Sequence, residues 1–227
     1  MCHGTASEVS ETTGLMFEFA GSVVRQLPRL SRGEMKRWCD NQAELKAALG
    51  KIFGRVVLTP AIWKQVYDAI GASTSEQALA ELMATKNQPN RWIEPVLRVT
   101  LNQTLTGLRK LGEKYNFTVY TYADDLDVAV PHNDRDPIKT GAYAISFAPN
   151  VEADEEFKNF SAEQLKERGH QGTTLLERLL VEMAYIIATE GEHLDDKNFT
   201  LCAGSRYSDG VVPDVDWSCD GRKVRVF

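Results

Sequence analysis

The chain has 227 residues, of which 43% are hydrophobic and 26% are charged. This size and composition are typical of one or two globular domains with buried cores, and they exclude collagen-like, low-complexity and fully disordered chains. No apolar run approaches the roughly 18 residues that span a bilayer, so no membrane partner is expected. The polar first residues, MCHGTASEVSETTG, lack the cationic start and apolar core of a secretory signal.

Charge is distributed unevenly along the chain, whose net charge is −6. Residues 1–116 hold 15 Lys and Arg against 11 Asp and Glu, whereas residues 117–227 hold 11 against 21. This asymmetry predicts two regions with different surfaces. The acidic second half would repel phosphates at long range, which argues against a nucleic-acid partner.

The cysteines and histidines do not have the spacing of a metal site. Cys2, Cys39, Cys202 and Cys219 form no CxxC pair, and no two of the 4 histidines are spaced as a metal-binding helical pair. We therefore predict no metal and no cofactor. Without an export signal, free thiols in a reducing cytoplasm are expected.

The sequence of the first 90 residues predicts a disordered segment followed by a small helical domain. Residues 1–12 are small, polar and acidic, and they are expected to be disordered. Over residues 13–90, apolar stripes and capping residues indicate successive helices. These helices are expected to begin after Gly14, at a Ser31–Glu34 capping box, after Asp40, at Thr59–Pro60, and at Ser73 or Ser75. The turn at Asn87–Asn90 marks the predicted domain boundary.

Residues 91–227 predict an α+β domain. Capping boxes at Ser161–Gln164 and Thr174–Glu177 predict two helices, and the second is expected to cover one face of a sheet. The fold class is therefore α+β: an N-terminal helical unit followed by a mixed β-sheet domain with packed helices. Strands are predicted at Val96–Leu101, Tyr143–Ala148, Phe199–Ala203 and Lys223–Phe227, a strand or an extended segment at Phe117–Tyr122, and an extended continuation at Val211–Trp217. A short helix is predicted over Leu105–Leu111 and a polar loop over Pro131–Thr140.

The last predicted strand, Lys223–Phe227, leaves two alternatives open. Either it is pinned inside the sheet, or the chain is part of something longer.

The segment TYADDLDVAV, Thr121–Val130, is a candidate catalytic motif. A YxDD box in a hairpin is the metal-binding signature of reverse transcriptases, in which adjacent carboxylates and a distant third one hold Mg²⁺ for phosphoryl transfer. Asp124 and Asp125 would take that role here. The sequence shows no upstream strand with a partner aspartate and no primer-grip segment, and the chain is short for such a polymerase. The structural alternative, which the sequence favours, is an acidic turn with Tyr122 and Leu126 packed inward.

The segment CAGSRYSDGVVPDVDW, Cys202–Trp217, gathers arginine, aromatic and acidic residues in a stretch rich in turns. Arginine and aromatic side chains near loops suit contact with a ligand or partner. The candidate ligand-binding residues are Arg206, Tyr207, Asp209 and Trp217. In the structural alternative, Arg206 pairs with Asp209 or Asp214, and Trp217 belongs to the core.

Two segments, GTTLLERLLVEM (Gly172–Met183) and FTLCAGSRYSDGVVPDVDW (Phe199–Trp217), resemble the C-terminal modules of uncharacterised bacterial hypothetical proteins. The segments VLRVTLNQTLTGLRKL, FTVYTYADDLD and LPRLSRGEMKRW are also similar to parts of such proteins. No function is attached to that family. The resemblance therefore implies a bacterial protein, but it implies no catalytic residue.

The sequence as a whole predicts a non-catalytic binding or protein-interaction module in the cytoplasm. Its ligand would be a protein or a small molecule that the sequence does not identify. The alternative is a metal-dependent phosphoryl-transfer or nucleic-acid enzyme that uses the carboxylates of Asp124 and Asp125.

Overall fold

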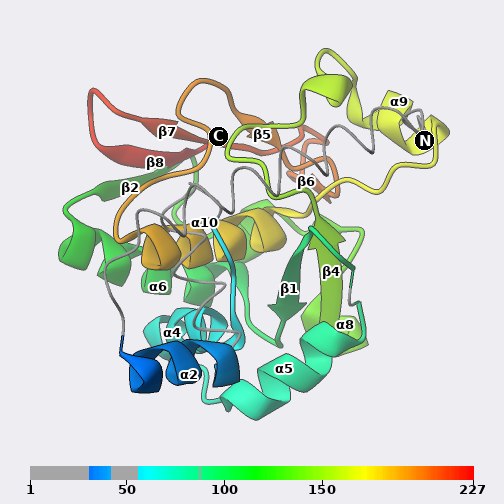
Figure 1. Cartoon of the computed structure of the whole chain (residues 1–227). Helices are drawn as coiled ribbons and strands as arrows, with labels where there is room; N and C mark the ends of the chain where they lie inside the picture. The colour runs from blue at the N-terminus through cyan, green and yellow to red at the C-terminus, as the bar shows by residue number, and fades with distance from the viewer. Residues whose placement is uncertain (1–30, 42–55, 87) are drawn as a thin grey trace. The chain divides into compact units, whose positions relative to one another are not determined.

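A computed structural model describes residues 31–41, 56–86 and 88–227 (Figure 1). The chain divides into two units, Met1–Leu49 and Gly50–Phe227, and each is described by itself. In the first unit, helix α2 (Arg32–Asp40) confirms the helix predicted after Ser31. The disorder predicted for residues 1–12 and the helices predicted after Gly14 and Asp40 lie outside the described residues.

Local capping chemistry sets the starts of the helices in the second unit. The hydroxyl of Thr59 accepts the N–H of Ile62 at 3.3 Å, and Pro60 occupies the first turn, where its missing N–H costs nothing. Reciprocal capping boxes open α9 and α10 at Ser161 and Thr174, as the sequence predicted. The helices are α4 (Pro60–Ile70), α5 (Glu76–Ala84), α6 (Leu101–Tyr115), α7 (Leu126–Ala129), α8 (Pro137–Thr140), the 3₁₀ helix η1 (Glu155–Phe157), α9 (Ala162–Glu167) and α10 (Leu175–Thr189).

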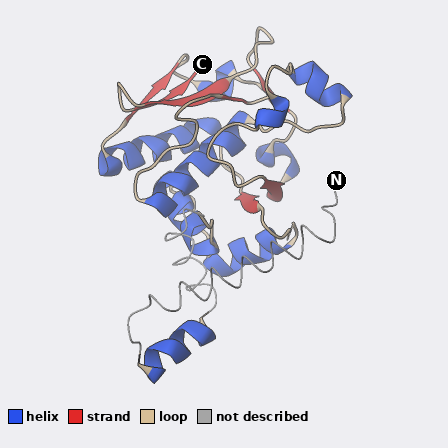
Figure 2. Cartoon of the chain, turned by 45° about the horizontal axis from the view of Figure 1, so that its top comes forward, coloured by secondary structure: helices blue, strands red, loops and turns tan. Residues whose placement is uncertain are grey.

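The strands form one mixed sheet and two antiparallel pairs. The mixed sheet has the order β2-β8-β7-β5, in which β2 runs parallel to β8 and the other pairings are antiparallel. The pairs are β1-β4 and β3-β6. The fold is therefore α+β, as predicted (Figure 2). The strands are β1 (Trp92–Val96), β2 (Thr118–Thr121), β3 (His132–Asn133), β4 (Tyr143–Phe147), β5 (Thr200–Leu201), β6 (Ser205–Arg206), β7 (Asp214–Ser218) and β8 (Lys223–Val226).

The strand predicted over Val96–Leu101 is wrong. Strand β1 ends at Val96, and α6 begins at Leu101 after the N-cap Thr100. The side chains of Thr100 and Gln103 form a capping box there, which satisfies two backbone N–H groups that a strand would have to pair elsewhere. The predicted loop over Pro131–Thr140 likewise contains β3 and α8.

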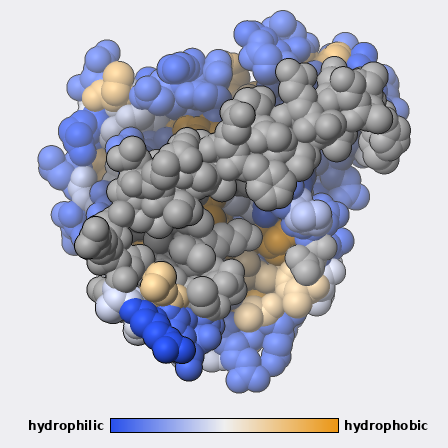
Figure 3. All heavy atoms as spheres, viewed as in Figure 1, coloured by the Kyte–Doolittle hydropathy of each residue, from blue (hydrophilic) through white to orange (hydrophobic). Residues whose placement is uncertain are grey.

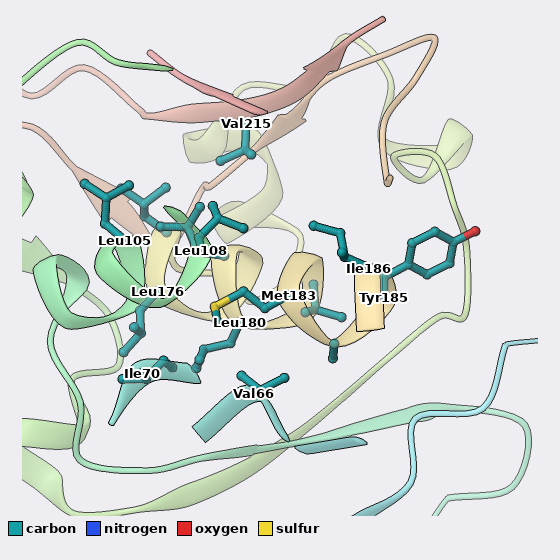
Figure 4. Packing of buried hydrophobic residues seen from close by; sticks show 14 of the residues in the cluster. Val66, Ile70, Leu105, Leu108, Leu176, Leu180, Met183, Tyr185, Ile186 and Val215 are labelled. Carbon is teal, nitrogen blue, oxygen red and sulfur yellow. The ribbon is translucent and has the colours of Figure 1, made fainter. Parts of the chain in front are cut away.

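Helix α10 lies at the centre of the core. Every residue from Leu175 to Ile187 is buried, so the helix is covered on all sides and not on one face alone. Figure 4 shows its apolar side chains meeting residues of α4, α6 and β7. The predicted boundary near residue 90 falls inside this unit, because α4 and α5 share one hydrophobic cluster with α6, α10 and the mixed sheet.

Two further observations concern the surface. Over the residues that the structure describes, no helix combines the length and the apolar character needed to cross a membrane. On the face seen in Figure 3, most of the described surface is hydrophilic, with smaller hydrophobic areas.

Candidate functional site

Strands β3 and β6 form a short antiparallel ribbon. One face of this ribbon points outward, and the other face is hydrogen-bonded to the start of α10. In its register, His132 lies opposite Arg206, and Asn133 lies opposite Ser205. On the inner face, the Ser205 hydroxyl donates to Asn133 Oδ1 at 2.5 Å and accepts the N–H of Leu175 at 2.8 Å. Because side chains alternate along a strand, His132 and Arg206 share the opposite face. The ribbon is thus fixed to the first residue of α10.

A close backbone contact holds the same ribbon rigid. A Cβ added at Gly172 would lie 2.5 Å from the Ala203 Cβ, and one added at Gly204 would lie 2.8 Å from the Gly172 carbonyl oxygen. The Gly204 N–H donates to the Thr173 carbonyl at 2.8 Å, and the Asp134 N–H donates to the Gly204 carbonyl at 2.8 Å. Only glycine allows two backbones to approach so closely, so both glycines are structural requirements of this ribbon.

The outward face of the ribbon forms part of an open pocket of about 350 Å³. Lys139 of α8 and Lys166 of α9 also line this pocket. Together with Arg206 they make three cationic residues in the lining. The residues that line the pocket are Pro131, His132, Asn133, Asp134, Lys139, Lys166, Gly204 and Arg206. We call this set the ribbon pocket.

The guanidinium of Arg206 is held in place at the wall of the ribbon pocket. Its Nη1 donates to the carbonyls of Ala203 at 2.8 Å and Ser205 at 2.7 Å, and its Nη2 lies 3.4 Å from a carboxylate oxygen of Glu163. The Arg206 side chain is 26% exposed and the Glu163 side chain 72% exposed. The predicted pairing of Arg206 with Asp209 or Asp214 is therefore replaced by carbonyl contacts and by Glu163.

The other three candidate binding residues take different positions. Tyr207 is buried, its hydroxyl has no partner among the described residues, and burial raises its pKa to about 12. Asp209 is exposed and accepts the N–H of Val211 within its turn. Trp217 stacks on His193 with ring centroids 3.5 Å apart and meets Phe117 edge-on. Of the four, Arg206 lines the ribbon pocket, and their joint role in binding stays a prediction.

Two carboxylates of the segment Thr121–Val130, those of Asp125 and Asp127, cap helices. Asp125 accepts the N–H of Val128 at the start of α7 and an amide N–H of Asn102, and these two contacts lower its pKa. Asp127 accepts the N–H groups of Leu101 and Asn102, at the start of α6. Asp124 is exposed. The structure brings no three His, Cys, Asp or Glu side chains into a metal-binding group within its described ranges.

These contacts favour the structural interpretation of the YADD segment over the metal-dependent one. Leu126 is buried, as that interpretation expects. The predicted burial of Tyr122 is wrong, because this side chain is 74% exposed.

A partly buried ionic network centres on Glu177. Arg135 donates from Nε and Nη2 to the two carboxylate oxygens of Glu177 at 2.6 and 2.7 Å, and Nη2 also donates to the Gly172 carbonyl. The Tyr143 hydroxyl donates to Glu177 at 2.8 Å. Because Glu177 also accepts the Thr174 N–H at the start of α10, it joins the helix, β4 and the loop before α8.

A second ionic group occupies the next turns of α10. Arg178 donates to Glu182 and to Asp195, each at 2.8 Å, and Glu182 lies 2.8 Å from His193 Nδ1. Burial alone would raise the pKa of Glu182, but Arg178 and His193 hold it below its usual value. These side chains are at most 8% exposed, so they pair with one another inside the core and do not face a ligand. Removing one member would leave a buried charge without its partner.

Comparisons with protein-family models, curated proteins and solved structures found no match to this chain. The resemblance to bacterial C-terminal modules therefore stays a prediction.

Sequence reasoning found Arg206 but missed His132, Lys139 and Lys166, because these residues come from separate segments that carry no motif. The one signal that the sequence offered was the turn-rich composition of Cys202–Trp217, which singled out Arg206.

Proposed function

We propose that this chain is a non-catalytic binding protein whose contact surface is the ribbon pocket, with Arg206 as its central contact. The observation that carries the proposal is the placement of Arg206 in an open pocket on a ribbon tied to the start of α10. A guanidinium already fixed by two carbonyls loses little side-chain entropy when it binds a ligand.

The composition of the ribbon pocket suits the binding of a polar ligand. Its lining residues supply cations, an imidazole, an amide and the carboxylate of Asp134, which can hold a ligand by charge and hydrogen bonds. A volume of about 350 Å³ lies at the lower end of the range for small-molecule sites. A small molecule therefore fits the pocket better than a protein segment.

A cytoplasmic location forms part of the same proposal. Cys202 is a buried free thiol and Cys219 an exposed one, and unpaired exposed thiols are typical of a reducing compartment. The origin in a bacterium that the resemblance implies is likewise proposed.

The experiment is a thermal-shift screen of the full chain against small anions, neutral sugars and amines. A compound that binds the native state raises the melting temperature by mass action. We expect at least one such compound, and we expect its shift to vanish in Arg206→Ala. The matched control is Arg222→Ala, since Arg222 also donates to two carbonyls, those of Asn116 and Tyr115, but lies outside the ribbon pocket. Shifts that survive Arg206→Ala, or a screen without any shift, would count against the proposal.

A further inference from the structure

We infer that the ribbon pocket binds the phosphate group of a small phosphorylated ligand that also carries hydroxyl groups. This inference rests on the proposed function and adds the chemical class of the ligand. It depends on how the cations of the pocket are arranged and partnered.

The cations of the pocket come from separate elements and gather at one place on the surface. Arg206 lies on β6, directly opposite His132 of β3. Lys139 and Lys166 approach the same space from α8 and α9. Lys139 and Arg206 have carboxylate partners in Asp136 and Glu163, but Lys166 has none among the described residues, so its charge is left for a bound anion.

Several of these groups have donors left for a ligand. Among the residues that the structure describes, neither the Lys166 ammonium nor the His132 imidazole makes a hydrogen bond or ion pair. Arg206 uses Nη1 for the two carbonyls and reaches Glu163 only at 3.4 Å, which leaves Nε and part of Nη2 available. Lys139 pairs with Asp136 at 2.9 Å, on a side chain that is 70% exposed.

A phosphate group matches this donor set. A phosphate monoester carries about −1.5 to −2 charges at neutral pH and three acceptor oxygens. An arginine fork can bind two of these oxygens while lysines act as point charges on the third. The lining residues carry three cations and the carboxylate of Asp134, while Asp136 pairs with Lys139 and Glu163 approaches Arg206 from beside the pocket. Lys166 is therefore the cation of the lining whose charge has no carboxylate partner among the described residues.

The rest of the pocket indicates what is attached to the phosphate. Asp134 also lines the pocket, and its N–H donates to the Gly204 carbonyl. A carboxylate accepts hydrogen bonds from hydroxyl groups and repels phosphate, so we place the hydroxyl groups of the ligand, and not its phosphate, at Asp134. The pocket is also larger than a bare phosphate requires.

The acidic surroundings favour a small ligand over a polyanion. Charges farther away than the Debye length, about 8 Å at physiological salt, are largely screened, so a single phosphate responds to the pocket cations. A nucleic acid would extend across the acidic surface of residues 117–227 and be repelled there.

Isothermal titration of the full chain tests the inference with three probes: ribose 5-phosphate, inorganic phosphate and ribose. We expect ribose 5-phosphate to bind more tightly than inorganic phosphate, and ribose not to bind. In the variant Lys139→Gln/Lys166→Gln, the dissociation constant for ribose 5-phosphate should rise roughly tenfold or more, since it loses two charge-assisted contacts. The control variant Lys64→Gln/Lys158→Gln removes the same charge from two exposed, ion-paired lysines outside the pocket and should leave the dissociation constant unchanged.

The outcomes separate the inference from the proposed function. Equal weakening in both double variants would show nonspecific attraction and would overturn the inference. If a neutral or cationic compound from the screen binds through Arg206 while both phosphates fail, the inference is wrong and the proposed function stands. If no compound depends on Arg206, both are wrong. Tighter binding of a phosphoserine peptide or a short RNA than of ribose 5-phosphate would overturn the small-molecule assignment.

Discussion

Glu94 is a carboxylic acid enclosed in the core. Its side chain is completely buried, and neither carboxylate oxygen has a hydrogen-bond partner among the described residues. Burial raises its pKa well above the usual value, and Glu177 raises it further against the opposing effect of Arg135 and Arg178. The native state therefore holds Glu94 protonated and neutral, which is the form that an apolar site tolerates.

This buried acid makes the stability of the fold depend on pH. Above the ordinary glutamate pKa of about 4.3, the unfolded chain releases the proton while the native state keeps it, so stability falls by about 1.4 kcal/mol per pH unit until the native pKa is reached. Glu94→Gln has no proton to lose. We expect urea unfolding to give similar stabilities for the two proteins near pH 5 and a clear advantage for the variant at pH 8.

Other carboxyl groups do not obscure this comparison between pH 5 and 8. The carboxyls of Asp125, Asp136 and Glu182 have lowered pKa values, so their contributions to stability are lost only at a pH more acidic than that window. Parallel stability profiles for the two proteins between pH 5 and 8 would show that Glu94 is ionised in the native state.

At the scale of the element, the start of α6 shows how a loop can complete a helix. Thr100 and its capping box satisfy part of the first turn, and Asp127 from α7 accepts the N–H groups of Leu101 and Asn102. A carboxylate at a helix N-terminus also interacts favourably with the helix dipole. The acidic segment that suggested a metal site is therefore part of the scaffold.

Asp127→Ala should destabilise the protein by about 1 kcal/mol, the usual loss for a helix cap. The neighbouring change Asp124→Ala removes an exposed acid of the same segment and should leave stability almost unaltered. Urea unfolding of both variants provides the measurement. Unchanged stability for Asp127→Ala, or an equal loss for Asp124→Ala, would contradict the capping role of Asp127.

Element starts could be predicted where the signal is local. The caps at Thr59, Ser75, Ser161 and Thr174 lie within three residues of the groups they bond, and the sequence predicted each start, with Ser75 one of two alternatives. The prediction of strand β1 failed because all five of its residues are buried, so its sequence WIEPV does not alternate between apolar and polar residues. The neighbouring sequence VLRVTL does alternate, and it led to a strand being predicted in the wrong place.

At the scale of the whole molecule, the ribbon pocket could be predicted only in part. Arg206 belongs to a turn-rich segment that the sequence singles out. His132, Lys139 and Lys166 reach it through a strand pairing and two short helices, and such long-range placement leaves no local pattern. Glu94 escaped notice for the same reason, since its neighbours come from α10 and from Arg135.

The shared core predicts that the elements on both sides of residue 90 unfold together. Val66 on α4 and Val224 on β8 are both fully buried in one hydrophobic cluster. Val66→Ala removes two buried methyl groups, a loss of about 2 kcal/mol. If unfolding is cooperative, native-state hydrogen exchange should show the slowest amides of α4, α10 and β8 losing protection by the same factor, roughly thirtyfold. Val128→Ala, at a 71% exposed position, is the matched control and should change none of them. Lost protection confined to α4 and α5 would instead support a separate helical domain ending near residue 90.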